Sequence, residues 1–172
     1  MPELPEIETI RRSLLPVVLR KPIESVEILV PRILPHGRAE DFTARLLGRS
    51  FLDLKRRGKY LIFSVQGGLE LVAHLRMTGR LIYYSDAGIP RSRHASAVFS
   101  FRSRDELRFE DLRKFGTLDL VPQGEYQTIH GLYTMGVEPL SEEFTADFFH
   151  RLLEGRQTRI KALLLDQKKI AG

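Results

Sequence analysis

The 172-residue sequence contains no cysteine. This absence excludes disulfide bonds, thiolate nucleophiles and zinc sites built from cysteine. The histidines show no metal-ligand spacing such as H-x-x-x-H; they are His36, His74, His94, His130 and His150. We therefore expect neither a metal nor another cofactor in this chain.

Long apolar runs are also lacking. No run approaches the roughly 18 residues that a membrane-spanning helix requires. The N-terminus, MPELPE, is acidic and rich in proline, whereas a signal peptide combines positive charge with a long apolar stretch. These features favour a cytoplasmic protein without membrane contact.

Positive charge is in excess. The net charge is +5 and the isoelectric point is about 9.7. This balance favours a polyanionic partner such as nucleic acid, because binding releases condensed counterions. Arginine greatly outnumbers lysine, however, and a biased genome could produce the same excess without a functional reason. The length suits one domain, at most with a small appendage.

The first helix is well marked. Pro5 suits the first helical position, where a missing N–H costs nothing. Ile7, Ile10 and Leu14 recur on one helical face, and Pro16 is predicted to end the helix. A short helix is expected over residues 40–47, and two more are expected between Pro139 and Gly155 and over residues 158–166. Ser141 or Thr145 would cap the former, and the apolar faces would consist of Phe144, Phe148 and Leu152 and of Ile160, Leu163 and Leu164.

Short strand-like segments separated by turn residues fill the middle of the chain. They are Val26–Val30, Ser50–Lys55, Tyr60–Val65, Leu69–Leu75, Leu81–Tyr84, Ala97–Phe101, Leu107–Phe109 and Thr117–Val121. About eight such strands favour an antiparallel sandwich or barrel. We predict an α+β fold, an antiparallel β-sandwich flanked by the N-terminal helix and C-terminal helices. Ser85–Arg93 is expected to be the most flexible stretch.

The N-terminus carries a candidate nucleophile. If Met1 is removed, Pro2 presents a secondary amine, which can add to an aldehyde carbon and form a cationic iminium. Glu3 and Glu6 place carboxylates beside it for proton transfer. Taken alone, however, Met-Pro-Glu begins many proteins and Pro5-Glu6 is an ordinary helix start.

Several segments read together change this interpretation. They are MPELPEIET at 1–9, RGKYL at 57–61, HLRMTG at 74–79, DLRKFG at 111–116, MGVEPLS at 135–141, and the pairs 160–161 and 166–167. In this order they resemble the formamidopyrimidine-DNA glycosylase and endonuclease VIII family. The resemblance covers essentially the whole chain. It implies a monomeric bacterial enzyme of the cytosol and nucleoid that acts on damaged double-stranded DNA in base-excision repair.

The resemblance also implies roles for individual residues. Pro2 would attack the sugar C1′ and form a Schiff base, Glu3 would protonate the opening sugar, Glu6 would support that site, and Lys59 would transfer protons during elimination. The expected DNA contacts are His74, Met77, His94, Arg113, Phe115, Arg156 and Lys161. Among these, Met77, Arg113 and Phe115 would fill the gap left by an extruded nucleotide. Each of these residues could also have a purely structural role, as a core side chain, a turn residue or a solvated surface charge.

The sequence departs from the family in two places. His94 belongs to an H-x-H pattern in much of the family, whereas Ser96 stands at the second position here. The family also continues with a helix–two-turn–helix module and a four-cysteine zinc finger, neither of which is present by Gly172. We expect a fragment with a catalytic domain at 1–140 and a helical segment at 141–172 that leads to a missing DNA-binding domain. Such a fragment is expected to bind DNA weakly and to be inactive or poorly active.

Two alternatives remain open. The resemblance implies oxidised purines as substrates, namely 8-oxoguanine and formamidopyrimidines, because the loops at 74–79 and 111–116 resemble that branch; the endonuclease VIII branch acts on oxidised pyrimidines instead. The other alternative is a non-catalytic nucleic-acid-binding β domain, which would stack bases on exposed aromatic residues such as Tyr83 and Tyr84.

Overall fold

The computed structural model describes residues 2–172 and forms two packed antiparallel sheets. One sheet has the order β2 (Phe51–Arg57), β3 (Tyr60–Val65), β4 (Leu69–His74), β8 (Thr117–Pro122). The other has the order β1 (Ile23–Ile28), β6 (Ala95–Phe101), β7 (Glu106–Asp111), β5 (Gly79–Tyr84). The predicted α+β sandwich of eight strands is confirmed. Removal of Met1 lies outside the described residues.

Aromatic residues fill the space between the sheets. Phe51 stacks on Phe63 within one sheet, with ring centroids 4.9 Å apart. It also meets Phe99 and Phe101 of the other sheet, both at 6.2 Å. All four side chains are fully buried, and such edge-on aromatic contacts add to the stability that burial provides. The sandwich therefore has one continuous core.

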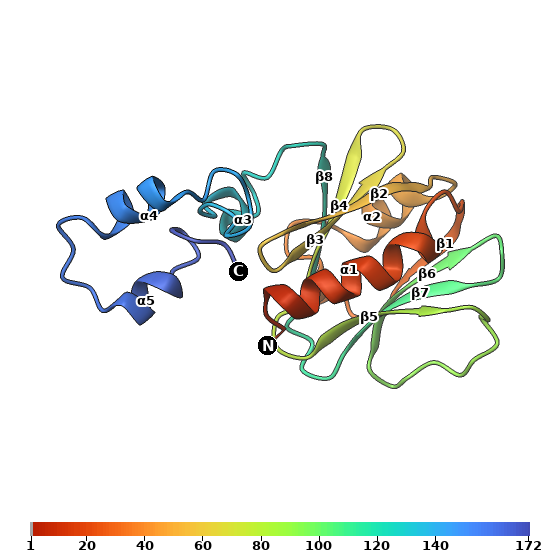
Figure 1. The fold of residues 1–172 in the computed structure, drawn as a ribbon. Coiled ribbons are helices and arrows are strands. Elements are labelled where there is room, and N and C mark those ends of the chain that lie inside the picture. The colour runs from red at the N-terminus through yellow and green to blue at the C-terminus, as the bar shows by residue number, and fades with distance from the viewer. Residues whose placement is uncertain (1) are drawn as a thin grey trace.

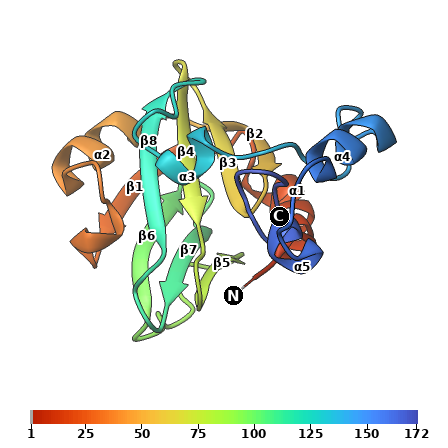
Figure 2. The same cartoon turned by 90° about the vertical axis from the view of Figure 1, so that its left-hand side faces the viewer.

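Helices cover the two open sides of the sandwich. Helix α1 (Leu4–Val18) packs against β2 and β5, which are edge strands of different sheets. On the opposite side, α2 (Ala39–Leu46) packs against β1, and the short 3-10 helix η1 (Pro31–Ile33) approaches β8. Figures 1 and 2 show the two helices on opposite sides of the sheets. The N-terminal residues are thus fixed beside strands of both sheets.

The C-terminal segment, residues 123–172, contains α3 (His130–Tyr133), α4 (Ala146–Leu153) and α5 (Ile160–Leu164). Ile129 and Leu132 pack on the outer face of the first sheet. Helix α4 buries none of its residues, and Figure 1 shows α4 and α5 beside the sandwich rather than on it. No helix within residues 2–172 is both long and apolar enough to cross a membrane.

Some predicted boundaries were wrong. Helix α1 continues through Pro16 to Val18, because Pro16 lies on the exposed side while Leu14 and Val18 are buried. Burial of these side chains offsets the backbone hydrogen bond that proline lacks. Strand β1 begins at Ile23 rather than Val26, since Ile23 pairs with Phe101. The sequence analysis did not predict η1 or α3.

Near the C-terminus the predictions were partly right. Thr145 caps α4, because its side chain accepts a hydrogen bond from the Phe148 N–H at 3.0 Å. In α5 only Leu163 points inward; Ile160 and Leu164 are about half exposed. The helix has a single turn, and one apolar position is enough to anchor it.

Candidate active site

The N-terminal turn of α1 holds two carboxylates next to Pro2. Glu3 precedes the helix, and the Glu6 carboxylate accepts a hydrogen bond from the Glu3 N–H at 3.0 Å. Such a contact pairs a backbone donor that would otherwise lack a partner at a helix start. Glu6 therefore fixes the backbone on which Pro2 and Glu3 lie.

Lys59 comes to the same place from the hairpin that joins β2 and β3. Arg57 pairs with Tyr60, so Gly58 and Lys59 form a two-residue turn. Gly58 has a φ of 54°, which glycine adopts easily and which suits the twist of a hairpin. Lys59 is 8% exposed, and its Nζ lies 2.5 Å from Glu3 Oε2. The sequence-predicted pair of acid and lysine is thus in direct contact.

Two loops at one end of the sandwich are joined by Asp111. Its Oδ1 accepts hydrogen bonds from the Thr78 hydroxyl at 2.5 Å and from the Arg113 N–H at 3.1 Å. Its Oδ2 accepts one from the Gly116 N–H at 2.8 Å. Burial opposes the charge on Asp111, but these hydrogen bonds hold its pKa below the usual value. The loop with Met77 and the loop at 112–116 therefore form one unit.

The side chains on this unit are exposed. Met77 is 44% and Phe115 is 51% exposed, although both are apolar. The Arg113 guanidinium lies 4.8 Å from the centre of the Phe115 ring, a distance that allows a cation–π contact. An exposed apolar pair with an arginine is a surface suited to contact a stacked or unstacked base.

His74 lies at the end of β4 and is 8% exposed. Burial, together with the positive charges of Arg76 and Lys59, lowers its pKa to about 4. Nδ1 accepts a hydrogen bond from the Arg76 N–H at 3.0 Å. Because a neutral imidazole has one N–H, the proton must then reside on Nε2. His74 is therefore a neutral hydrogen-bond donor at physiological pH.

A cavity of about 510 Å³ connects these elements. Its lining includes Pro2, Glu6, Met77 and His94 among the predicted residues, and Thr78, Asp111 and Leu112 from the two loops. The other predicted residues of this region lie outside its lining: Glu3, Lys59, His74, Arg113 and Phe115. Arg156 and Lys161 lie on the C-terminal segment, exposed and outside this lining.

Asp111 and Thr78 received no role from sequence reasoning. Both fall inside the family-like motifs, and a carboxylate at the end of a strand was the only available signal. Tyr83 and Tyr84 are not exposed stacking residues as expected. The Tyr83 hydroxyl donates to Asp105 at 2.6 Å, and the ring of Tyr84 covers Arg108 at 4.0 Å. Across residues 2–172, no group of three histidine, aspartate or glutamate side chains could hold a metal ion.

Comparisons with known proteins agree with these observations. A family model described as the formamidopyrimidine-DNA glycosylase N-terminal domain matches residues 1–118. A formamidopyrimidine-DNA glycosylase from Desulforamulus reducens is 46% identical, over 100% of this chain and 62% of the relative.

Two solved structures of the Lactococcus lactis Fpg are also similar. One is a complex with DNA containing an abasic site, with a TM-score of 0.90 and 34% identity over 99% of this chain and 62% of that chain. The other is a complex with DNA containing FAPY-dG, with a TM-score of 0.89 and 33% identity over 99% and 63%. The chain thus spans less than two thirds of the length of these relatives.

Proposed function

This chain belongs to the formamidopyrimidine-DNA glycosylase family, and from that premise we propose that it is the catalytic part of a base-excision repair glycosylase with AP lyase activity. The observation that carries the proposal is the contact of 2.5 Å between Lys59 Nζ and Glu3 Oε2, because Glu3 directly follows Pro2, which lines the cavity. A potential nucleophile at the cavity wall is thus adjacent in the chain to an acid that contacts a lysine amine.

The chemistry begins at the nitrogen of Pro2. With Met1 removed, this nitrogen bonds to the sugar C1′ while the bond from C1′ to the damaged base breaks. Glu3 protonates the ring oxygen as the sugar opens, which leaves an iminium at C1′. The iminium acidifies the proton on C2′, and its removal expels the 3′ phosphate. Lys59, held beside Glu3, is placed to transfer protons in this elimination.

The exposed loop residues suit the DNA side of this reaction. Extruding a nucleotide costs a few kcal/mol, and apolar side chains such as Met77 and Phe115 replace the lost stacking. Arg113 can donate to the unpaired opposite base. A neutral His74 donates to a phosphate from Nε2 without the cost of a buried charge.

The C-terminal segment and His94 would add contacts to the phosphate backbone of the DNA. Arg156 and Lys161 are exposed on the segment at 141–172, which we propose as the connection to the part that longer relatives contain. The chain spans 62% of a relative, and we propose that residues 1–172 on their own bind DNA more weakly than the whole relative. Equal affinity for abasic DNA in a gel-shift titration would refute this.

Oxidised purines are the proposed substrates. The similar Lactococcus lactis enzyme has been solved with DNA containing FAPY-dG and also with DNA containing an oxidised pyrimidine, so the proposed preference for purines rests on the loops at 74–79 and 111–116. The test is a panel of duplexes with 8-oxoguanine, a formamidopyrimidine or an oxidised pyrimidine, incubated with the chain at high concentration. Faster incision of the purine lesions is expected. Faster incision of the pyrimidine lesion would instead assign the endonuclease VIII activity.

A non-catalytic DNA-binding domain is the remaining alternative. It would leave the contact between Glu3 and Lys59 without a purpose, and the two tyrosines expected to serve it are engaged by Asp105 and Arg108. Borohydride treatment with abasic DNA separates the two functions, since an iminium is reduced to a stable adduct. A binding domain would give a gel shift and no covalent adduct.

A further inference from the structure

The loop between β5 and β6, residues 85–94, is bound to the sheet through Arg108. This side chain lies on β7 and is fully buried. Its guanidinium donates to the carbonyls of Ile89 at 2.7 Å and Pro90 at 3.2 Å, and its Nε donates to Glu106 at 2.6 Å. The rigid fork of an arginine can serve two successive carbonyls at once, whereas a lysine has a single charged atom. Arg108 therefore fixes the middle of a loop whose glycine, proline and charged residues predict flexibility.

A second arginine strengthens this attachment. The guanidinium of Arg91, in the same loop, lies 2.8 Å from the carboxylate of Glu27 on β1 and 3.0 Å from that of Glu106. The ring of Tyr84 lies over the Arg108 guanidinium at 4.0 Å. Glu106 is buried, so the loss of an arginine partner would leave its charge poorly compensated, which is costly. We call Arg91, Glu106 and Arg108 the loop anchor.

The loop continues from the anchor to the candidate active site. In its last turn the Ser92 hydroxyl accepts a hydrogen bond from the His94 N–H at 3.1 Å, and the Ser92 carbonyl accepts one from the Ala95 N–H at 3.0 Å. The His94 carbonyl in turn accepts from the Asp111 N–H at 2.9 Å. His94 lines the same cavity as Pro2. The anchor and these hydrogen bonds thus determine where the end of the loop lies relative to that cavity.

Arg93 differs from its neighbour Arg91 in what surrounds its charge. Arg91 contacts two carboxylates, whereas the exposed Arg93 has none within ion-pair distance among residues 2–172. The Arg93 Nε donates to His94 Nε2 at 3.2 Å, which places the guanidinium beside the His94 ring. In the described chain the two Nη groups of Arg93 have no hydrogen-bond partner, and such a fork suits the oxygens of a phosphate.

Acidic residues of the cavity restrict where a phosphate can lie. Glu6, Glu110 and Asp111 are part of the lining. Glu110 accepts a hydrogen bond from the Tyr84 hydroxyl at 3.1 Å, and the other two accept from backbone N–H groups. Carboxylates in the lining repel a phosphate inside the cavity, but they do not repel a neutral base or sugar. A phosphate is therefore favoured at the rim, beside His94, where Arg93 lies.

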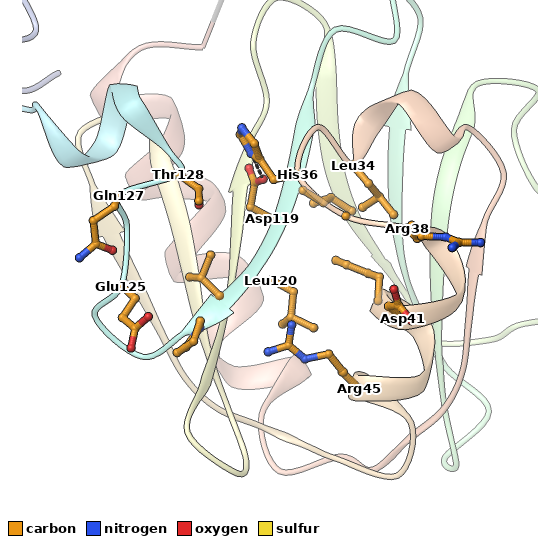
Figure 3. A pocket seen from close by; sticks show the side chains of 15 residues that line it. Leu34, His36, Arg38, Asp41, Arg45, Asp119, Leu120, Glu125, Gln127 and Thr128 are labelled. Atoms are coloured by element: carbon orange, nitrogen blue, oxygen red, sulfur yellow. Dashed lines mark hydrogen bonds and ion pairs between the residues drawn. The ribbon is translucent and has the colours of Figure 1, made fainter.

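Another cavity of the sandwich offers no comparable site for an anion. It lies beside β8 and has a volume of about 320 Å³. Figure 3 shows Arg38, Asp41 and Arg45 on one side of it and Glu125 on the other. The two acids there offset the positive charge of the two arginines. Arg93 is thus distinguished both by its unpaired charge and by its place next to the candidate active site.

We propose that Arg93 binds a phosphate of the damaged DNA at the rim of the active-site cavity, and that Arg108 is the positioning residue that holds it there. This inference rests on the proposed function, since the partner is the same DNA. Arg93 donates from its Nη groups to the phosphate oxygens, while its Nε remains bonded to His94. Arg108 is buried and does not touch DNA; it acts through the carbonyls of Ile89 and Pro90.

Salt-dependent binding tests the phosphate contact. The probe is a fluorescent duplex with a tetrahydrofuran abasic site, titrated with the chain at several salt concentrations. Arg93→Gln is expected to weaken binding roughly tenfold to thirtyfold. It should also reduce the slope of log K against log salt by about 1, which corresponds to one phosphate contact.

The matched control is Arg102→Gln. It removes the same charge from the exposed turn after β6, at the other end of that strand from His94, and should leave affinity and slope unchanged. An unaltered slope in Arg93→Gln, or an equal change in Arg102→Gln, would overturn the phosphate contact.

A second variant tests the positioning role. Arg108→Lys keeps the charge but cannot serve both carbonyls, so it should weaken binding roughly threefold to tenfold and add little to Arg93→Gln in the double variant. Circular dichroism verifies the fold. If Arg108→Lys does not fold, Glu27→Gln replaces it, since the Glu27 side chain is 45% exposed and its loss loosens only Arg91; a smaller, equally non-additive loss is expected. Additive losses would overturn the positioning role.

Borohydride trapping on abasic DNA separates this inference from the proposed function. At saturating DNA, Arg93→Gln should form the adduct as fast as the unaltered chain, because Arg93 lies at the rim rather than at the reacting atoms. No adduct with the unaltered chain would refute the proposed function. An adduct together with an unaltered salt slope in Arg93→Gln would refute the phosphate contact alone.

Discussion

The sandwich (residues 2–122) and the C-terminal segment (residues 123–172) are held together by different forces. The sandwich buries 24 hydrophobic residues in one cluster, and every proposed catalytic residue lies on it. In the C-terminal segment, α4 buries none of its residues. The difference indicates that the catalytic geometry depends on a rigid core, whereas the segment is positioned mainly by its junction with that core.

Polar contacts join the segment to the sandwich beside the apolar cluster of Ile129 and Leu132. Arg56 bonds to Glu138 at 2.9 Å and to Glu8 at 3.3 Å, and Arg57 donates to the Gly136 carbonyl at 2.8 Å. Hydrogen bonds from Arg11, with further ones from Arg12 and Arg56, lower the pKa of Glu8 to about 2. The junction therefore attaches to the β2–β3 hairpin, whose turn carries Lys59.

The largest difference in the free energy of unfolding between the two regions is expected from the replacement of one phenylalanine in each. Phe63→Ala should reduce the free energy of unfolding by about 3–5 kcal/mol, since Phe63 is fully buried between the sheets. Phe148→Ala on α4 should cost less than about 1 kcal/mol. Urea denaturation followed by circular dichroism measures both. Similar losses would show that the segment shares the core of the sandwich.

A pH titration is expected to show the burial of His74. Its pKa is about 4 in the folded protein and about 6.5 when unfolded, so the unfolded state binds more protons between these values. The free energy of unfolding should be constant above about pH 6.5 and should fall by up to about 3 kcal/mol as the pH decreases toward 4.

The control for this titration is His74→Asn, which should remove the dependence between pH 4 and 6.5. Loss of stability from Glu8 appears only below its unfolded pKa of about 4.3 and would remain. The matched variant His150→Asn, on exposed α4, should leave the curve unchanged. An unaltered slope in His74→Asn would contradict the burial argument.

Glu138→Gln tests the junction. It removes a partner of Arg56, whose side chain is 12% exposed, and is expected to cost about 1–3 kcal/mol. Limited proteolysis should show faster cleavage after residue 136 while the sandwich stays intact. Glu142→Gln, an exposed neighbour, is the control. Uniformly faster cleavage in both regions would mean that the junction stabilises the whole fold.

Asp111→Asn should have the smallest effect on DNA binding among the site residues, because it alters the positions of the two loops rather than a group that contacts DNA. The amide can accept only with one oxygen, so it loses a hydrogen bond to either Thr78 or the 112–116 loop. We expect roughly tenfold weaker binding to abasic DNA, on the order of 1 kcal/mol. Thr78→Val should weaken binding similarly, and the double variant should not add to it. Additive losses would show that Asp111 does not couple the loops.

Much of the sandwich could be predicted from the sequence because its signals are local. Alternating residues and glycine turns located β3 and β4, and the order of family-like motifs located the N-terminus, Lys59 and both loops. The end of α1 and the start of β1 were wrong because burial of Val18 and pairing of Ile23 with Phe101 are tertiary effects.

Some features of the site could not be predicted at all. The hydrogen bonds of Asp111 join residues 33 positions apart, and no local pattern predicts such a contact. Which backbone N–H and C=O groups of β8 bond to β4 depends on the register of the two strands, and the sequence of a strand alone does not fix that register. Motifs thus gave the residues of the site, while the sheet topology determined which of them meet.

The most direct test of the account locates the covalent bond to DNA. Protein from which Met1 has been removed, as verified by mass spectrometry, is reduced with borohydride on abasic DNA, digested and mapped. The expected adduct is on the nitrogen of Pro2, and Lys59→Met should still form it. An adduct on Lys59, whose Nζ lies 2.5 Å from Glu3 Oε2, or no adduct at all, would contradict the assignment of Pro2 as the nucleophile.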